Sequence, residues 1–207
     1  MSASDRSTPI FRGRAYAAFL FDMDGTLLDS SRVVERVWTA WARRHGHDPA
    51  EVLAACQGLQ YRDTLRRFAM PEVDIEREAQ ALLQAELDDT EGVMAIAGIK
   101  TLIADLDPRR WAIVTSAPRA LAETRLRAVG LPIPWCFITG ESVGRGKPDP
   151  EGFLKAAQLL GAPIAECLVF EDSPAGVAAG RAAGARVAIV GQLVPACEGN
   201  LAITDYL

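Results

Sequence analysis

The chain has 207 residues, of which 49% are hydrophobic and 24% are charged, and its net charge is −5. A chain of this length and apolar content buries a core in one large domain or two modest ones, which excludes general disorder. The mild negative charge gives no electrostatic footprint for nucleic acid or for an anionic membrane surface. No run of about 18 apolar residues is present, so we expect no membrane-spanning helix.

The cysteines and the N-terminus indicate a reducing compartment. Four cysteines lie far apart and form no CxxC pair: Cys56, Cys136, Cys167 and Cys197. This pattern is typical of free thiols, and with only two histidines in the chain a zinc site lacks ligands. Because the first residues contain no apolar run of signal-peptide length, we expect a cytoplasmic protein.

Short apolar runs alternate with helical patterns through most of the chain. The runs that predict buried strands are residues 16–21, 111–115, 135–139, 167–170 and 186–190. The segments between them that predict helices are residues 119–129, 151–160 and 174–183. This alternation predicts an α/β fold with a doubly wound, Rossmann-like parallel sheet covered by helices on both faces.

One long segment interrupts the alternation. Residues 31–97 show helical periodicity and no strand-like run, and Trp38 and Trp41 lie on one apolar face of the first predicted helix. A segment of this length is too long for a loop, so it predicts an all-helical domain inserted into a core made of residues 15–30 and 98–207. We expect the two tryptophans to pack in the core of that insert. Residues 1–14 are polar and predict a flexible tail.

Polar side chains follow three of the predicted strands at the point where each strand ends. They are Asp22, Asp24, Thr115, Ser116, Glu171 and Asp172. Ligands of open α/β sheets bind beyond the carboxyl ends of the strands, so we expect these side chains to converge at one edge. A cluster of carboxylates is unfavourable unless a cation neutralises it, and oxygen ligands without His or Cys favour Mg²⁺.

Residues of this edge have the chemistry that phosphoryl transfer requires. Lys147, in the loop after the third strand, can bring a positive charge to the same edge. Asp22 can attack phosphorus and form an aspartyl phosphate, while Asp24 can protonate the leaving oxygen and later deprotonate a water molecule. A metal ion, a lysine and paired hydroxyls that face a nucleophilic aspartate together predict phosphoryl transfer.

Residues 22–30, with the sequence DMDGTLLDS, resemble the first motif of the haloacid dehalogenase superfamily, DxDGTLxDS. Thr115-Ser116 matches the second motif of that superfamily, Lys147 the third, and Glu171-Asp172 the fourth, in the same order. The resemblance extends from Tyr16 onward. Taken together, the four motifs are highly specific, whereas any one of them alone is weak.

The resemblance implies a role for each motif residue. It makes Asp22 the nucleophile and Asp24 the general acid and base. Mg²⁺ is implied at the Asp22 carboxylate, the Asp24 backbone carbonyl and the Asp172 carboxylate, with Glu171 nearby through water. The residues implied to bind the transferring phosphoryl group are Thr115, Ser116 and Lys147. The second acid, Asp24, indicates a phosphatase or a mutase, because relatives that cleave carbon–halogen bonds lack it.

Four longer segments are similar to the group of glycerol-phosphate and deoxyglucose-phosphate phosphatases. They are residues 90–98, 111–116, 137–150 and 170–180. Members of that group carry a small helical cap after the first motif, which is where this chain has its helical insert. The similarity implies a Mg²⁺-dependent phosphatase for a small phosphorylated sugar or polyol. Because no heptad seam demands a partner, we expect a monomer, and the charge pattern predicts neither nucleic acid nor membrane as partner.

Three alternatives stay open at this point. A sugar phosphomutase of the β-phosphoglucomutase type would use the same four motifs, and so would a phosphoglycolate phosphatase. A non-catalytic binding protein on a retained fold is disfavoured, because such a protein would have lost Asp22 or Asp24. The segments that select the substrate lie in the insert and form no sharp motif.

Overall fold

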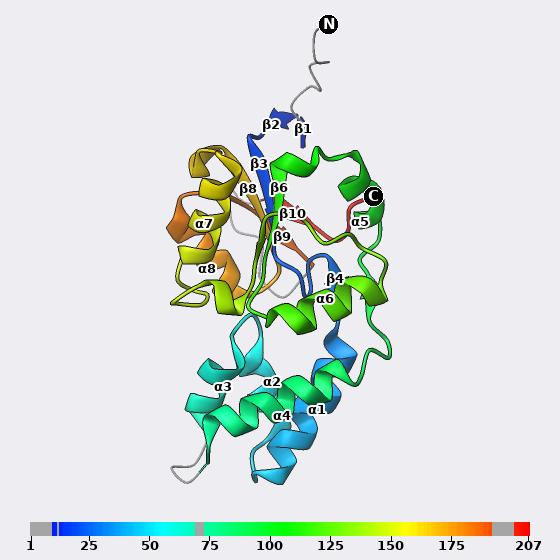
Figure 1. Cartoon of the computed structure of the whole chain (residues 1–207), viewed down its shortest axis with the longest axis vertical. Helices are drawn as coiled ribbons and strands as arrows, with labels where there is room; N and C mark the ends of the chain where they lie inside the picture. Colours follow the sequence, from blue (N-terminus) through cyan, green and yellow to red (C-terminus); the bar gives the residue numbers. More distant parts are fainter. Residues whose placement is uncertain (1–9, 12, 69–72, 192–200) are drawn as a thin grey trace, which may run out of the picture.

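A six-stranded parallel sheet forms the centre of the computed structural model, which describes residues 10, 11, 13–68, 73–191 and 201–207. The strand order is β10-β9-β8-β3-β6-β7 (Figure 1). The bounds are β3 (Ala18–Phe21), β6 (Trp111–Val114), β7 (Phe137–Ile138), β8 (Cys167–Glu171), β9 (Arg186–Val190) and β10 (Leu201–Ile203). The predicted α/β fold is therefore confirmed.

The strands predicted over 16–21, 111–115 and 167–170 are present with bounds that differ by one or two residues, and two further differences are larger. The strand predicted over 135–139 is shorter, because only Phe137 and Ile138 pair with β6. Strand β10 was not predicted; it has three residues, too few to show a pattern, and it pairs in parallel with β9.

Helices cover both faces of the sheet. Helices α5 (Ile99–Asp105) and α6 (Arg119–Ala128) lie on one face, and α7 (Glu151–Leu160) and α8 (Pro174–Ala183) lie on the other (Figure 1). Short 3-10 turns occur at Pro108–Arg110, Gly140–Ser142 and Ile164–Glu166. The predicted helices over 151–160 and 174–183 have the predicted bounds, and each ends at a glycine in the left-handed conformation.

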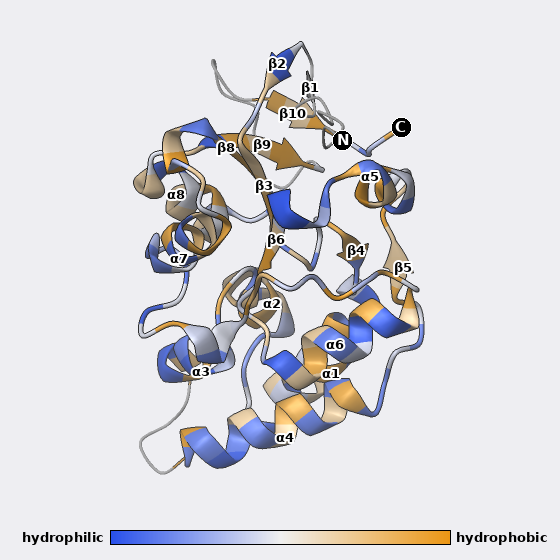
Figure 2. Ribbon diagram, turned by 45° about the horizontal axis from the view of Figure 1, so that its top comes forward, coloured by the Kyte–Doolittle hydropathy of each residue, from blue (hydrophilic) through white to orange (hydrophobic). Residues whose placement is uncertain are grey.

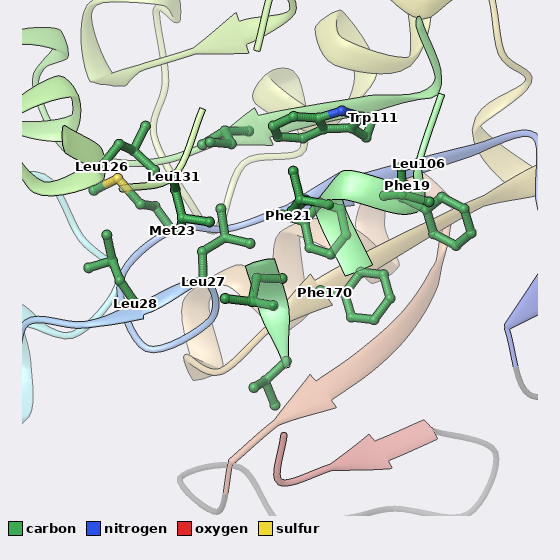
Figure 3. Packing of buried hydrophobic residues seen from close by; sticks show 14 of the residues in the cluster. Phe19, Phe21, Met23, Leu27, Leu28, Leu106, Trp111, Leu126, Leu131 and Phe170 are labelled. Carbon is green, nitrogen blue, oxygen red and sulfur yellow. The ribbon is translucent and has the colours of Figure 1, made fainter. Parts of the chain in front are cut away.

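Successive side chains of β3 point to opposite faces, so the sheet separates two cores. Phe19 and Phe21 pack with α5 and α6, whereas Ala18 and Leu20 pack with α7 and α8. On the first face Phe21 stacks on Phe170 of β8 with ring centroids 4.6 Å apart (Figure 3). These fully buried strands hold the ends of β3, β6 and β8 rigidly side by side.

The predicted helical insert consists of α1 (Ser31–Arg44), α2 (Pro49–Cys56), α3 (Tyr61–Phe68) and α4 (Ile75–Leu87). We call these four helices the cap. The cap has its own apolar cluster, in which Trp38 and Trp41 are buried as predicted. Its helices α1 and α4 alternate hydrophilic and hydrophobic residues along their length (Figure 2).

A short antiparallel ribbon joins the cap to the sheet domain. It pairs β4 (Leu28–Asp29) with β5 (Met94–Ala95). The prediction that residues 31–97 contain no strand is therefore wrong at Met94 and Ala95. Two residues carry no periodic pattern, and their partner lies far away in the sequence, so no local signal marked them.

The structure describes part of the N-terminal segment and three of the four cysteines. Within the segment predicted as a flexible tail, β1 (Ile10–Phe11) pairs with β2 (Arg14–Ala15), and residues 1–9 and 12 lie outside the described residues. Of the predicted thiols, Cys56, Cys136 and Cys167 are free, and Cys197 lies outside the described residues. None of the helices in the described ranges is both long enough and apolar enough to cross a bilayer.

Candidate active site

The carboxyl ends of β3, β6 and β8 meet at one edge, because β3 lies between the other two strands. Asp22 directly follows β3, and its backbone N–H donates to the carbonyl of Phe170 at 2.9 Å. The structure brings carboxylate oxygens of Asp22, Glu171 and Asp172 within 4.8 Å of one another. All three side chains are buried or nearly so, which makes this edge a dense, desolvated cluster of acids.

Lys147 lies at the centre of this acid cluster. Its Nζ donates to Oδ1 of Asp22 and to Oε1 of Glu171, and the side chain is buried. Burial alone would lower the pKa of Lys147, but the charges of Asp22 and Glu171 outweigh that effect and raise it. Burial also raises the pKa of Asp22, and the charge of Lys147 opposes that rise. The lysine therefore stays protonated and holds one oxygen of Asp22.

Glu171 has an anchoring role that the sequence did not reveal. Its Oε1 holds Lys147, and its Oε2 accepts from the backbone N–H groups of Asp172 and Ser173 at 3.1 and 3.2 Å. A Cβ on Gly176, in the first turn of α8, would overlap this carboxylate. Glu171 thus sets the position of Lys147 as well as completing the acid cluster. Its predicted place beside a metal ion, through water, stays a prediction.

The acid cluster fits a hard divalent cation. Three carboxylates and one ammonium leave an excess of two negative charges, and every donor is an oxygen. Burial, followed by the charge of Glu171, raises the pKa of Asp172 to about 7. The charge of Lys147 only partly opposes this rise, and Mg²⁺ would supply the further positive charge that favours ionisation. Asp22, Asp172 and the Asp24 backbone carbonyl stay the predicted ligands.

Asp24 points away from the acid cluster, toward the cap. Its Oδ1 accepts from Ser30 Oγ at 2.6 Å and from Arg125 Nη1 at 2.9 Å. Its side chain is 28% exposed, so it is the more accessible of the two aspartates. The motif thus places two acids, two residues apart in the sequence, in different surroundings.

Sequence reasoning missed Arg125 and its cap partner. Arg125 is buried in α6, and its Nη2 donates to Glu86 Oε2 of α4 at 2.7 Å. The same Glu86 oxygen accepts from the Tyr61 hydroxyl of α3, also at 2.7 Å. A signal was present: Arg125 lies on the face of α6 that also carries Leu121 and Ala122, where a solvated arginine is not expected.

The predicted phosphate-binding hydroxyls lie beside the acids. Thr115 Oγ1 accepts from the backbone N–H of Ala117 at 3.1 Å. Ser116 Oγ donates to the carbonyl of Gly58, between α2 and α3, at 2.8 Å. The Ser116 hydroxyl therefore contacts the cap, and its predicted phosphate contact, like that of Thr115 and Lys147, stays a prediction.

A cavity of about 520 Å³ lies between this edge and the cap. Its floor includes Asp22, Asp24 and Asp172, and its roof includes Trp38, Tyr61 and Glu86 of the cap. This volume suits a small ligand. The mixture of apolar, aromatic and acidic lining suits a molecule that carries both a carbon skeleton and hydroxyl groups.

The family model described as "haloacid dehalogenase-like hydrolase" matches residues 16–184. The chain belongs to this family. The predicted superfamily is thereby confirmed, and so is the prediction of an enzyme.

Two relatives with named activities show which kind of hydrolase the chain resembles. The chain is 48% identical over 176 residues to hexitol phosphatase A of Escherichia coli (strain K12), covering 83% of this chain and 82% of that one. It is 37% identical over 191 residues to 2-deoxyglucose-6-phosphate phosphatase 1 of Saccharomyces cerevisiae, covering 80% and 76%. The predicted resemblance to sugar and polyol phosphatases is confirmed by these relatives.

Solved structures of other proteins share the fold. A hydrolase from Pseudomonas syringae superimposes with a TM-score of 0.76 at 29% identity, covering 84% of each chain. A β-phosphoglucomutase from Clostridium difficile superimposes with a TM-score of 0.79 at 21% identity, covering 92% of each chain. The second likeness concerns the fold alone.

Proposed function

We propose that this enzyme is a Mg²⁺-dependent phosphatase that hydrolyses a small sugar or polyol phosphate through an aspartyl-phosphate intermediate. The observation that carries the proposal is that Asp22 lines the floor of the cavity together with Asp24 and is paired with the buried ammonium of Lys147. The relatives named for hexitol and 2-deoxyglucose-6-phosphate phosphatases support the substrate class.

Two displacements at phosphorus make up the reaction. In the first, an oxygen of Asp22 attacks phosphorus, the bond from phosphorus to the substrate oxygen breaks, and Asp24 gives its proton to that oxygen. In the second, a water molecule attacks phosphorus and gives a proton to Asp24. The bond from phosphorus to Asp22 then breaks, which releases inorganic phosphate and restores both acids.

The other residues of the edge bind and orient the reacting groups. Lys147 holds Oδ1 of Asp22, which leaves Oδ2 to attack phosphorus. Thr115, Ser116 and Lys147 are proposed to hold the phosphoryl oxygens. Mg²⁺, held by Asp22, Asp172 and the Asp24 carbonyl, would neutralise the charge that gathers on those oxygens. The cap covers the cavity and limits access of bulk water.

The test is a phosphate-release assay with wild-type protein and the Asp22→Asn variant. The panel comprises hexitol phosphates, 2-deoxyglucose 6-phosphate, glycerol 1-phosphate and phosphoglycolate, each with Mg²⁺ and with EDTA. We expect selective, Mg²⁺-dependent release by the wild type and loss of turnover in a folded Asp22→Asn protein. Substantial turnover by Asp22→Asn would refute the nucleophile assignment, and activity unchanged in EDTA would refute the metal.

A further inference from the structure

Arg125 bridges the catalytic edge and the cap, and neither the motifs nor the proposed chemistry assigns it a role. Its side chain is 4% exposed, lies on α6 of the sheet domain, and has an acid at each end of its guanidinium group. One acid is Asp24 and the other is Glu86 of the cap. An arginine this deeply buried is costly unless both of its partners are well placed, so its position is tightly determined.

The contacts to Asp24 fix which of its oxygens meets the substrate. Among the described residues, both hydrogen bonds to the Asp24 side chain, from Ser30 and from Arg125, end on Oδ1. An oxygen that accepts two hydrogen bonds at 2.6 and 2.9 Å is a poor place for a proton. In the proposed mechanism the proton that Asp24 delivers is therefore left to Oδ2, to which none of the described residues donates.

The cap holds the other end of Arg125. Glu86 Oε2 accepts from Arg125 and from the Tyr61 hydroxyl, each at 2.7 Å, and its side chain is 2% exposed. Glu86 lies on α4 and Arg125 lies on α6, and these two helices pack against each other where the cap meets the sheet domain (Figure 2). Any displacement of the cap relative to the sheet domain must stretch or break the bond between Glu86 and Arg125.

We propose that Arg125 is a positioning residue that aligns Asp24 for proton transfer, and that Glu86 of the cap holds Arg125 in place for this task. The inference rests on the proposed function, in which Asp24 is the general acid and base. It adds that the cap takes part in aligning the acid, besides covering the cavity.

The test compares two substrates that differ in their need for an acid. The polyol phosphate turned over fastest in the panel releases an alkoxide-like oxygen that needs a proton, whereas 4-nitrophenyl phosphate releases a stable anion that does not. We expect Arg125→Met to lower kcat for the polyol phosphate by about 10- to 100-fold. The rate at which nitrophenolate is released in the first turnover should change little, and so should KM for each of the two substrates.

Four further variants test whether the loss of rate is specific to the contacts of Arg125. Arg125→Lys should restore part of the rate, and Glu86→Gln should lower it less than Arg125→Met does. Arg127→Met, on the same helix but 65% exposed, should behave as the wild type. Arg125→Met leaves the carboxylate of Glu86 buried without its cation, which can prevent folding. If that variant does not fold, the double variant Arg125→Met/Glu86→Gln replaces it in the assay, because it removes the unpaired charge as well.

A double-mutant cycle with Asp24→Asn decides whether Arg125 acts through Asp24. If it does, Arg125→Met lowers the polyol-phosphate rate no further once Asp24 is Asn. Equal losses on both substrates, a raised KM with unchanged kcat, or an independent loss in the Asp24→Asn background would overturn the inference. An Asp24→Asn enzyme with the wild-type rate on the polyol phosphate would instead overturn the proposed acid and base. A loss in Asp24→Asn without one in Arg125→Met would overturn this inference alone.

Discussion

Gly25 directly follows Asp24 within the first motif, and a single methyl group there should disable the enzyme. Its φ is +81°, a left-handed conformation that residues with a Cβ adopt at a cost. The Cβ of an alanine at this position would overlap the carboxylate of Asp172. Gly25→Ala therefore combines backbone strain with displacement of a predicted metal ligand.

A second glycine supplies the control for the backbone strain. Gly161 ends α7 with φ +65°, and none of the described atoms lies within 4 Å of the Cβ it would gain. The left-handed conformation should cost each alanine about 1–2 kcal/mol of unfolding free energy. For a chain of this size that cost lowers Tm by about 2–4 °C per kcal/mol. Any loss in Gly25→Ala beyond that of Gly161→Ala measures the displacement of Asp172.

Thermal unfolding with and without MgCl₂, combined with phosphate release, separates the two effects. Gly161→Ala should lose stability only and keep both its kcat and its gain in Tm from Mg²⁺. Gly25→Ala should lose most of its activity and should no longer gain in Tm from Mg²⁺. If Gly25→Ala were as active as Gly161→Ala, the close packing of Gly25 on Asp172 would have no bearing on metal binding.

Two more predictions follow from the buried charges. Since burial raises the pKa of Asp172 to about 7, a proton competes with Mg²⁺ below that pH, and the Mg²⁺ affinity measured by calorimetry should fall by up to about tenfold per pH unit between pH 7 and 5. A flat profile for the wild type would contradict this reasoning. Lys147→Met leaves Asp22 and Glu171 buried without their cation and should lower the unfolding free energy in urea by about 3–5 kcal/mol. Lys155→Met, which breaks a half-exposed pair with Glu151 and a hydrogen bond to the Ser142 carbonyl, is the control and should change stability little.

The place of the acid cluster could be predicted because its residues stand where buried strands end. Asp22 and Glu171 each come at the end of a short apolar run, and parallel strands bring such ends to one edge. The helices of the sheet domain could be bounded because their stop signals are local, as Gly161 and Gly184 show. Both predictions use only residues that are close together in the sequence, and the first also uses the rule that parallel strands end at the same edge of a sheet.

What could not be predicted depends on contacts between distant parts of the chain. Strand β5 exists because two residues pair with β4, and nothing local distinguishes them. The bond between Glu86 and Arg125 joins two helices of different domains, so neither helix alone reveals it. The sequence did contain a hint, since Arg125 stands on the apolar face of its helix; a charged residue in that position calls for a buried partner.

In the proposed mechanism the two aspartates of the motif have different tasks, and different parts of the molecule hold them in place. Asp22 is held through Lys147 and Glu171 of the sheet domain, and the cap reaches this pair indirectly, through Gln60, which packs on the loop that carries Lys147. Asp24 is held through Arg125, whose other partner is Glu86 of the cap. A substitution that shifts the cap should therefore impair proton transfer before it impairs attack on phosphorus. The division explains how one strand end can present a fixed nucleophile beside an acid whose position depends on the part of the molecule that covers the substrate.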